Sequence, residues 1–237
     1  MKKLFRVMIM LTGLILFFSC TTNGSIVLAN DDSGSFVLDS KMSANLYKTM
    51  IAFGDIDESE NVFSSDLVKT FFTQAGLTLS SVIIENPREI SFSGHSPDIK
   101  NVLNAKSQPI TITERGAKKV FTLLLNDETM LAFISLLNED SLMYLDLLQA
   151  PLFTREEMSA EEYEEFIAAL YGQKLSNDLK DSYVTLDINI PKATTEASVY
   201  PKNLAKIEKS YKKITFNIKL SELLANSSEA RFEIIWE

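Results

Sequence analysis

Histidine and cysteine, which often serve as general base and nucleophile, occur once each in this chain of 237 residues. The histidine, His95, stands between Ser93 and Ser96 in a segment rich in glycine, serine and proline. A base beside a serine hydroxyl is the arrangement that nucleophilic catalysis needs. A serine nucleophile usually sits on a sharp turn of the G-x-S-x-G type, however, and this segment has none. We interpret it as a surface turn and expect no catalytic residue and no enzyme activity.

Clustered carboxylates are the next groups that could do chemistry. Asp55 to Glu60 starts like a calcium loop, but Glu60 replaces the glycine of the sharp turn and Asp66 the bidentate glutamate. The segment 31–34 is equally unspecific. Six glutamates lie between Glu156 and Glu165, and Glu161, Glu162, Glu164 and Glu165 are expected on one exposed helix face, where they cannot flank a sugar across a cleft. We predict solvated carboxylates at all three places, and neither a metal nor a cofactor.

The basic residues gather in one place, which we predict as a possible patch for an anionic ligand or partner, with a solvated loop as the alternative. The whole chain has 23 Lys and Arg against 32 Asp and Glu, a net charge of −9. This balance argues against nucleic acid, which needs a basic face to displace counterions. The five lysines lie within twelve residues: Lys202, Lys206, Lys209, Lys212 and Lys213.

The strongest signal is at the start of the chain. Lys2, Lys3 and Arg6 precede an apolar run of twelve residues, Val7 to Phe18. A membrane span needs about twenty such residues, so the run fits the core of a secretory signal peptide. It ends at Ser19 and Cys20, and polar residues follow at once.

A small residue directly before a lone cysteine, after such a core, resembles the lipobox of bacterial lipoproteins. The resemblance covers residues 1–20 only. It implies cleavage before Cys20, a diacylglycerol on the Cys20 thiol and an acyl group, such as palmitate, on the new amino terminus. The chain has Phe17 and Phe18 where the usual box has other residues; loosened boxes of this kind resemble those of spirochaete lipoproteins. The alternative is an ordinary secreted protein with a cysteine at its cleavage region.

The resemblance implies a location outside the cytoplasm, anchored by lipid in the cell membrane or the outer membrane. Residues 1–19 hold three basic and no acidic residues, so the mature chain has a net charge of −12. An acidic body is repelled by anionic lipid, and two or three acyl chains must hold it at the membrane. We predict a signal peptide at 1–19, a lipidated cysteine and short tether at 20–35, and one domain at 36–237 with a possible subdomain junction near Pro151. Within the tether, the apolar residues 26–29 are alternatively a first strand.

The domain is predicted to be α+β, with an antiparallel sheet covered on one face by helices. Its best-defined helix follows a capping box at Ser159 and Glu162, and its last strand places Phe232, Ile234 and Trp236 on one face. Deleting residues 231–237 should therefore make the protein insoluble. Alternation predicts strands at 36–42, 77–85, 89–93, 110–113, 120–125, 184–190, 197–200, 214–220 and 231–236, and helical spacing predicts helices at 43–53, 65–75, 130–137, 141–148, 159–171 and 221–225.

For the function, these observations favour a lipid-anchored binding or scaffolding protein of the bacterial cell envelope. Its expected partners are the membrane, through the lipid, and an envelope protein or an anionic ligand. The alternative is a carrier of a lipid or small ligand, with an apolar pocket between sheet and helices. The 15 phenylalanines are compatible with such a pocket, and equally with an ordinary core. A cell-envelope hydrolase is the third hypothesis and requires carboxylates or His95 to converge in a cleft.

Overall fold

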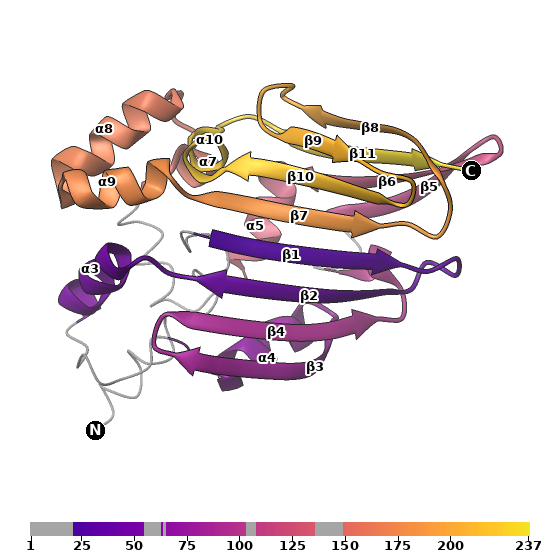
Figure 1. Cartoon of the computed structure of the whole chain (residues 1–237), viewed down its shortest axis with the longest axis horizontal. Coiled ribbons are helices and arrows are strands. Elements are labelled where there is room, and N and C mark those ends of the chain that lie inside the picture. Colours follow the sequence, from indigo (N-terminus) through magenta and orange to yellow (C-terminus); the bar gives the residue numbers. More distant parts are fainter. Residues whose placement is uncertain (1–20, 55–62, 64, 103–107, 136–148) are drawn as a thin grey trace.

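The computed structural model describes residues 21–54, 63, 65–102, 108–135 and 149–237 (Figure 1). In this part of the chain the strands form two sheets. The first has seven strands in the order β3 (Thr78–Asn86), β4 (Glu89–Ser96), β2 (Gly34–Lys41), β1 (Thr21–Leu28), β7 (Tyr183–Asn189), β10 (Lys213–Lys219) and β9 (Lys206–Lys209). The second has four, in the order β5 (Ile110–Arg115), β6 (Lys118–Leu125), β11 (Ala230–Trp236) and β8 (Thr194–Tyr200).

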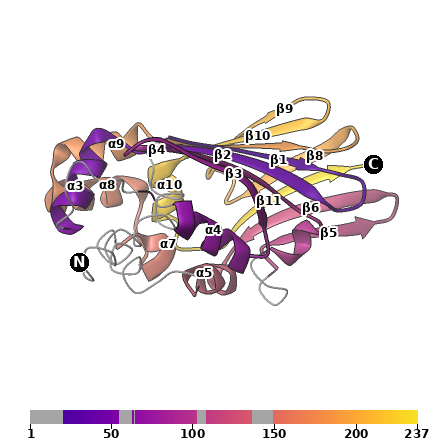
Figure 2. The same cartoon turned by 90° about the horizontal axis from the view of Figure 1, so that it is seen from below.

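The two sheets face each other, and helices gather at one end of the strands (Figure 2). The large sheet packs against the small one through aromatic contacts such as Phe216 on Phe232, whose ring centroids are 5.2 Å apart. The outer face of the large sheet carries no helix among the described residues. The helices are α3 (Ala44–Gly54), α4 (Ser65–Gln74), α5 (Asp127–Ile134), α7 (Pro151–Thr154), α8 (Ala160–Tyr171), α9 (Gln173–Lys180) and α10 (Leu220–Ala225), with a 3-10 turn, η1, at Ile99–Asn101.

The predicted α+β class is confirmed, with two sheets in place of one. Nearly all strand pairs are antiparallel, and β1 with β7 is parallel. Apolar alternation, helical spacing and helix caps predicted most of the strands and helices close to where the structure has them. The Ser159 side chain accepts from the Glu162 amide while the Glu162 carboxylate accepts from the Ser159 amide, which is the predicted capping box. The predicted helix at 141–148 lies outside the described residues.

The last strand is a core element, as predicted. Phe232, Ile234 and Trp236 of β11 are 1%, 0% and 2% exposed. β11 lies between β6 and β8, so its backbone is hydrogen-bonded on both sides. Removing it would separate two strands and open the core, which supports the expectation that deletion of residues 231–237 prevents folding.

The predicted tether at 20–35 is wrong, and the alternative of a strand at 26–29 is confirmed in part, because the strand exists but starts earlier. Residues Thr21 to Leu28 form β1, which pairs with β2 on one side and β7 on the other. The start of β1 looks like a linker because it is polar and contains Gly24. In the sheet, however, its backbone is paired on both sides, and a Cβ at Gly24 would lie only 3.3 Å from the Leu186 side chain. Residues from Thr21 onward are therefore part of the folded domain.

The predicted junction near Pro151 is also wrong. Both sheets combine strands from before and after this residue, because β1 pairs with β7 and β6 pairs with β11. Pro151 occupies the first turn of α7, where its missing N–H removes no hydrogen bond. The chain is therefore not divided at this position.

Candidate functional site: an apolar cavity between the sheets

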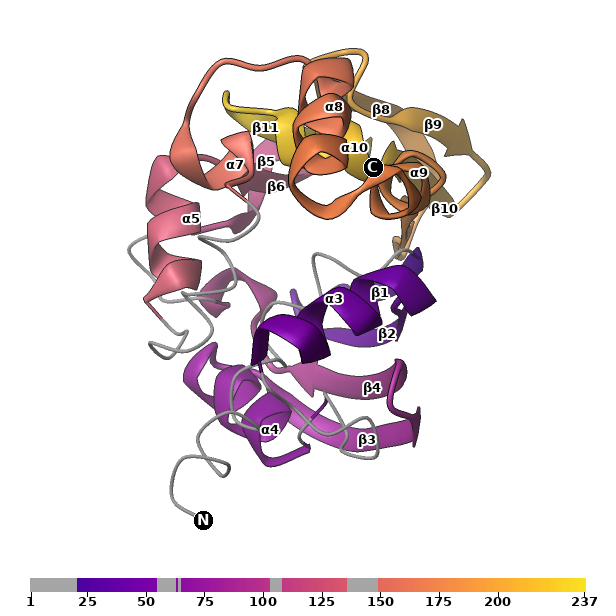
Figure 3. The ribbon, with the colours of Figure 1, turned by 90° about the vertical axis from the view of Figure 1, so that its left-hand side faces the viewer.

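An apolar cavity of about 320 Å³ lies between the two sheets. Helices α4 and α5 close its sides with Phe71, Phe72 and Phe133, and α10 contributes Leu223. Figure 3 looks at the molecule from the helical end, with the two sheets on opposite sides of the interior. The sheets contribute most of the remaining wall: Thr22, Gly24, Leu38, Val184, Thr185, Leu186 and Ile218 from the large sheet, and Ile110, Leu123, Leu125 and Phe232 from the small one. Connecting segments add Ala75, Leu77, Val102 and Pro109.

The cavity occupies only one half of the space between the sheets. Along β7, Val184 and Leu186 are partly exposed and line the cavity, whereas Ile188, on the same face, is fully buried. Along β6, Leu123 and Leu125 are partly exposed, whereas Phe121 is fully buried. The same strands therefore build a closed core at one end and a cavity wall at the other.

The wall offers almost no polar chemistry. Among the residues that the structure describes, no charged side chain lines the cavity. The hydroxyl of Thr22 lies 3.4 Å from that of Ser40, so this polar group has a neighbour within the protein. A polar ligand group placed inside would lose its water without gaining partners, which is costly. The site therefore fits an apolar molecule, and its volume lies at the lower end of the range of small-molecule sites.

The cavity opens to solvent, and its apolar wall, which includes Val184, Leu186, Leu123 and Leu125, is only partly buried. Covering such a wall with an apolar ligand removes hydrocarbon surface from water, which is favourable at about 25 cal/mol per Å². The cavity therefore favours an apolar ligand through the surface that the ligand would bury.

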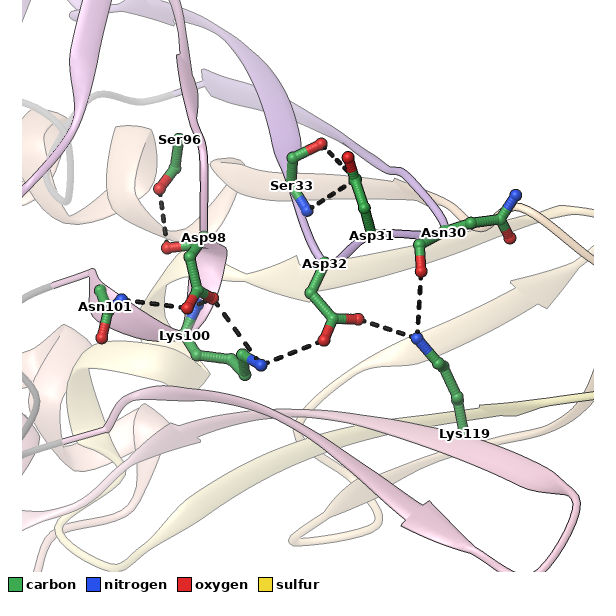
Figure 4. A network of polar contacts seen from close by, with 9 residues as sticks. All are labelled: Asn30, Asp31, Asp32, Ser33, Ser96, Asp98, Lys100, Asn101 and Lys119. Carbon is green, nitrogen blue, oxygen red and sulfur yellow. Dashed lines mark hydrogen bonds and ion pairs between the residues drawn. The ribbon is translucent and has the colours of Figure 1, made fainter.

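At the end of the sandwich opposite to the cavity, a network of charged groups joins the two sheets (Figure 4). Asp32, in the turn between β1 and β2, accepts hydrogen bonds from Lys119 of β6 at 2.9 Å and from Lys100 of η1 at 3.0 Å. Lys119 also donates to the Asn30 carbonyl at 3.2 Å. The hydrogen bond from Lys119 is the largest of the effects that lower the pKa of Asp32, and Lys100 adds to it. We name these residues, Asp32, Lys100 and Lys119, the Asp32 clasp.

The Asp32 clasp corrects the expectation that residues 31–34 form a solvated acidic loop. Only Asp31 is exposed to solvent, and its carboxylate accepts from the hydroxyl and amide of Ser33 within the turn. Asp66 is exposed in the first turn of α4, while the segment 55–60 lies outside the described residues.

The sequence did not predict a second charged group, a buried glutamate in helix α8. Glu161, Glu162 and Glu165 of α8 are exposed as expected, but Glu164 is buried. Its carboxylate accepts from Ser221 at 2.7 Å and from Lys219 at 2.9 Å, and lies 3.5 Å from Lys180. Burial by itself raises the pKa of Glu164, but the hydrogen bonds from Ser221 and Lys219 outweigh it, so the pKa lies below its ordinary value. The group joins α8 to α9, α10 and β10.

The five lysines do not project from one face. Lys206 and Lys209 lie three residues apart on β9, so their side chains point to opposite faces. Lys206 pairs with Glu208 at 3.0 Å, Lys209 donates to the Thr195 carbonyl, and Lys213 pairs with Asp187 at 2.8 Å. Lys202 and Lys212 are exposed. The charges of Lys206 and Lys213 are thus partly neutralised within the protein.

His95 lies in strand β4 and not in a surface turn. The hydroxyl of Ser93 lies 2.8 Å from that of Ser81, and the Ser96 hydroxyl donates to the Asp98 carbonyl at 2.8 Å. Ser96 points to the buried face while His95 is exposed, because neighbouring strand residues alternate. Within the described residues no group of three or more His, Cys, Asp or Glu side chains could hold a metal, and no helix is long and apolar enough to span a membrane.

No protein family compared with the chain matches it, and no curated protein matches its sequence. Among solved structures, the chain is similar to the folded domain of LppM from Mycobacterium tuberculosis. The TM-score is 0.41 at 9% identity, and the match covers 91% of this chain and 87% of that domain. At this level of similarity, neither a common fold nor a common function is established.

Proposed function

We propose that the protein is a lipid-anchored, extracytoplasmic component of the bacterial cell envelope that binds an apolar ligand in the cavity between its sheets. The cavity of about 320 Å³, in whose wall the described part of the chain places no charged residue, is the observation that carries the ligand-binding function. It favours a carrier over a scaffold, because a scaffold has no use for an apolar hollow whose wall is exposed to water. The anchor rests on the residues around Cys20, and on the first strand beginning directly after it.

Ligand binding is tested with a probe whose fluorescence rises in apolar surroundings, such as N-phenyl-1-naphthylamine. We expect saturable binding to the wild type and a loss of at least about tenfold in affinity for Leu123→Trp, whose indole ring would project into the cavity. Filling the void should also stabilise the variant by about 0.5–2 kcal/mol. The matched control is Leu170→Trp, which makes the same change at a residue of α8 that is 52% exposed.

A second filling variant, Val184→Phe, replaces Leu123→Trp if the latter does not fold. Saturable binding that is equally strong in the wild type and in a folded, cavity-filled variant would contradict the proposed site. The absence of any saturable binding to the wild type would contradict the function.

The anchor is tested by membrane fractionation and intact mass of the native protein beside Cys20→Ala. We expect the wild type to begin at residue 20, to carry the mass of diacylglycerol and to remain in the membrane fraction. The variant should lack this modification. A wild type that is soluble and cleaved elsewhere would refute the anchor and leave the cavity proposal intact.

A further inference from the structure

We infer that the ligand is the hydrocarbon chain of a membrane lipid, which enters the cavity tail first from the end of the sandwich next to Cys20. This inference rests on the proposed function and adds the class of ligand, its orientation and its source. Three features of the structure support it: the position of the cavity, the chemistry of its wall, and the closure of the opposite end.

The cavity lies at the end of the sandwich where β1 begins. Thr22 and Gly24 of β1 line it, and the register places Val184 and Leu186 of β7 beside them. The Cα atom of Cys20 is at most about 8 Å from that of Thr22, because only two peptide units separate them. A lipid anchor on Cys20 would therefore hold this end of the molecule, where the helices also gather, close to the bilayer surface and bring the cavity within reach of it.

The wall selects a hydrocarbon chain over a polar ligand. Of the described side chains that line the cavity, all are apolar except Thr22 and Thr185. Thr185 alternates with Val184 and Leu186, so its hydroxyl points to the other face of the sheet, where it bonds to Asn217 at 3.1 Å. A charged headgroup has no partner inside and must remain in water at the opening.

The opposite end of the sandwich is closed. Ile188 and Ile234, on the inner faces of the two sheets, are fully buried. Beyond them the Asp32 clasp ties the β1–β2 turn to β6 and η1. Among the described residues the cavity therefore ends within the sandwich, and a chain that enters from the Cys20 end stops against the core.

The source of the chain is a free lipid of the membrane. The anchor's own acyl chains are needed in the bilayer, since one chain holds a protein only marginally and two or three hold it stably. The acidic body, with a net charge of −12 after loss of residues 1–19, adds no attraction to an anionic membrane. Withdrawing an anchoring chain into the cavity would thus weaken the attachment.

The inference is tested with residues 20–237 carrying Cys20→Ala, which spans every strand and helix described, and with saturated fatty acids of increasing length. Each buried methylene should strengthen binding about fourfold. The gain should stop once about ten methylenes are buried, because the cavity of about 320 Å³ holds roughly ten water-sized groups. Replacing the carboxylate by a phosphocholine headgroup should change the affinity less than removing two methylenes does.

The outcomes separate this inference from the proposed function. If N-phenyl-1-naphthylamine binds but affinity does not depend on chain length, the cavity binds apolar ligands and the inference is wrong. If neither the probe nor the fatty acids bind, both are wrong. If the native lipidated protein binds fatty acid only after Cys20→Ala, the occupant is the protein's own anchor and the assigned source is wrong. Leu123→Trp should abolish the chain-length dependence, and Leu170→Trp should preserve it.

Discussion

Glu164 shows how much of a residue's role depends on elements far away in the sequence. Helical spacing placed it among exposed glutamates, because Tyr163 and Ile167 supply the apolar face of α8. The burial of Glu164 arises from Lys180 on α9, Lys219 at the end of β10 and Ser221 on α10, which approach it from outside α8. Spacing within a single helix contains no information about these partners.

Replacing Glu164 by Gln should lower the free energy of unfolding by about 1–3 kcal/mol at neutral pH, because the hydrogen bonds to its charged carboxylate are lost. Since the folded-state pKa of Glu164 lies below its ordinary value, its stabilising contribution is present above the unfolded pKa of about 4.3 and lost as the pH falls through the folded one. Urea titrations at several pH values measure this effect.

The matched control is Glu165→Gln, on the exposed side of the same helix, which should change the stability by less than about 0.5 kcal/mol. The stabilities of the wild type and Glu164→Gln should converge at acidic pH. A difference that stays constant down to low pH would show that the charge of Glu164 is not what stabilises the fold.

Asp32 is the second residue whose role the sequence left open, since its two lysine partners lie 68 and 87 positions away. We expect Asp32→Asn to lower the free energy of unfolding by about 1 kcal/mol, because both lysines are partly exposed and the ion pairs are partly screened. The control is Asp31→Asn, whose amide oxygen can still accept from Ser33. Equal losses in both variants would argue against the Asp32 clasp.

At the scale of elements, strand β1 is the largest correction to the sequence analysis. The apolar alternation of residues 36–42 identified β2 correctly, since one face of that strand is buried. β1 lacks this pattern because Thr22 and Gly24 face a cavity where a core strand would have large side chains. The feature that made the strand look like a linker is therefore part of the proposed site.

A chain beginning at residue 36, where the sequence suggested that the domain starts, should not fold. It lacks β1, which separates β2 from β7 in the middle of the large sheet. A chain beginning at residue 21 should give a cooperative thermal transition by circular dichroism. A cooperative transition for the shorter chain would mean that β2 and β7 can pair directly.

For several other elements, patterns of neighbouring residues were sufficient to predict where the element begins and ends. Caps and glycines fixed the ends of α8 and the hairpin between β5 and β6, because these signals act within a few residues. The division into two sheets could not be predicted, since it depends on which strands pair across the chain. β11, for example, pairs with β6, more than a hundred residues earlier.

At the scale of the molecule, the two ends of the sandwich differ in packing. The Asp32 clasp and a filled core close one end, while the cavity and the helices occupy the other. A composition with 15 phenylalanines is compatible with a pocket or a plain core. The distinction required the three-dimensional placement of Phe71, Phe72 and Phe133, which stand around the cavity.

A bound lipid chain should stabilise the whole molecule. At a free ligand concentration of about 100 times the dissociation constant, the gain is about 2.7 kcal/mol. The thermal midpoint of the wild type should therefore rise with added fatty acid, and that of the cavity-filled Leu123→Trp should not. A similar rise in both proteins would mean that the ligand binds elsewhere.

The absence of a tether has a consequence for how such a protein could be released from cells. Proteases cut extended, unpaired backbone, and loops or linkers are their usual targets. Here the segment that follows Cys20 is hydrogen-bonded on both sides within a sheet. If Cys20 carries the proposed lipid, protease added to intact cells would meet paired strand from Thr21 onward, so a copy displayed at the surface should resist cleavage there.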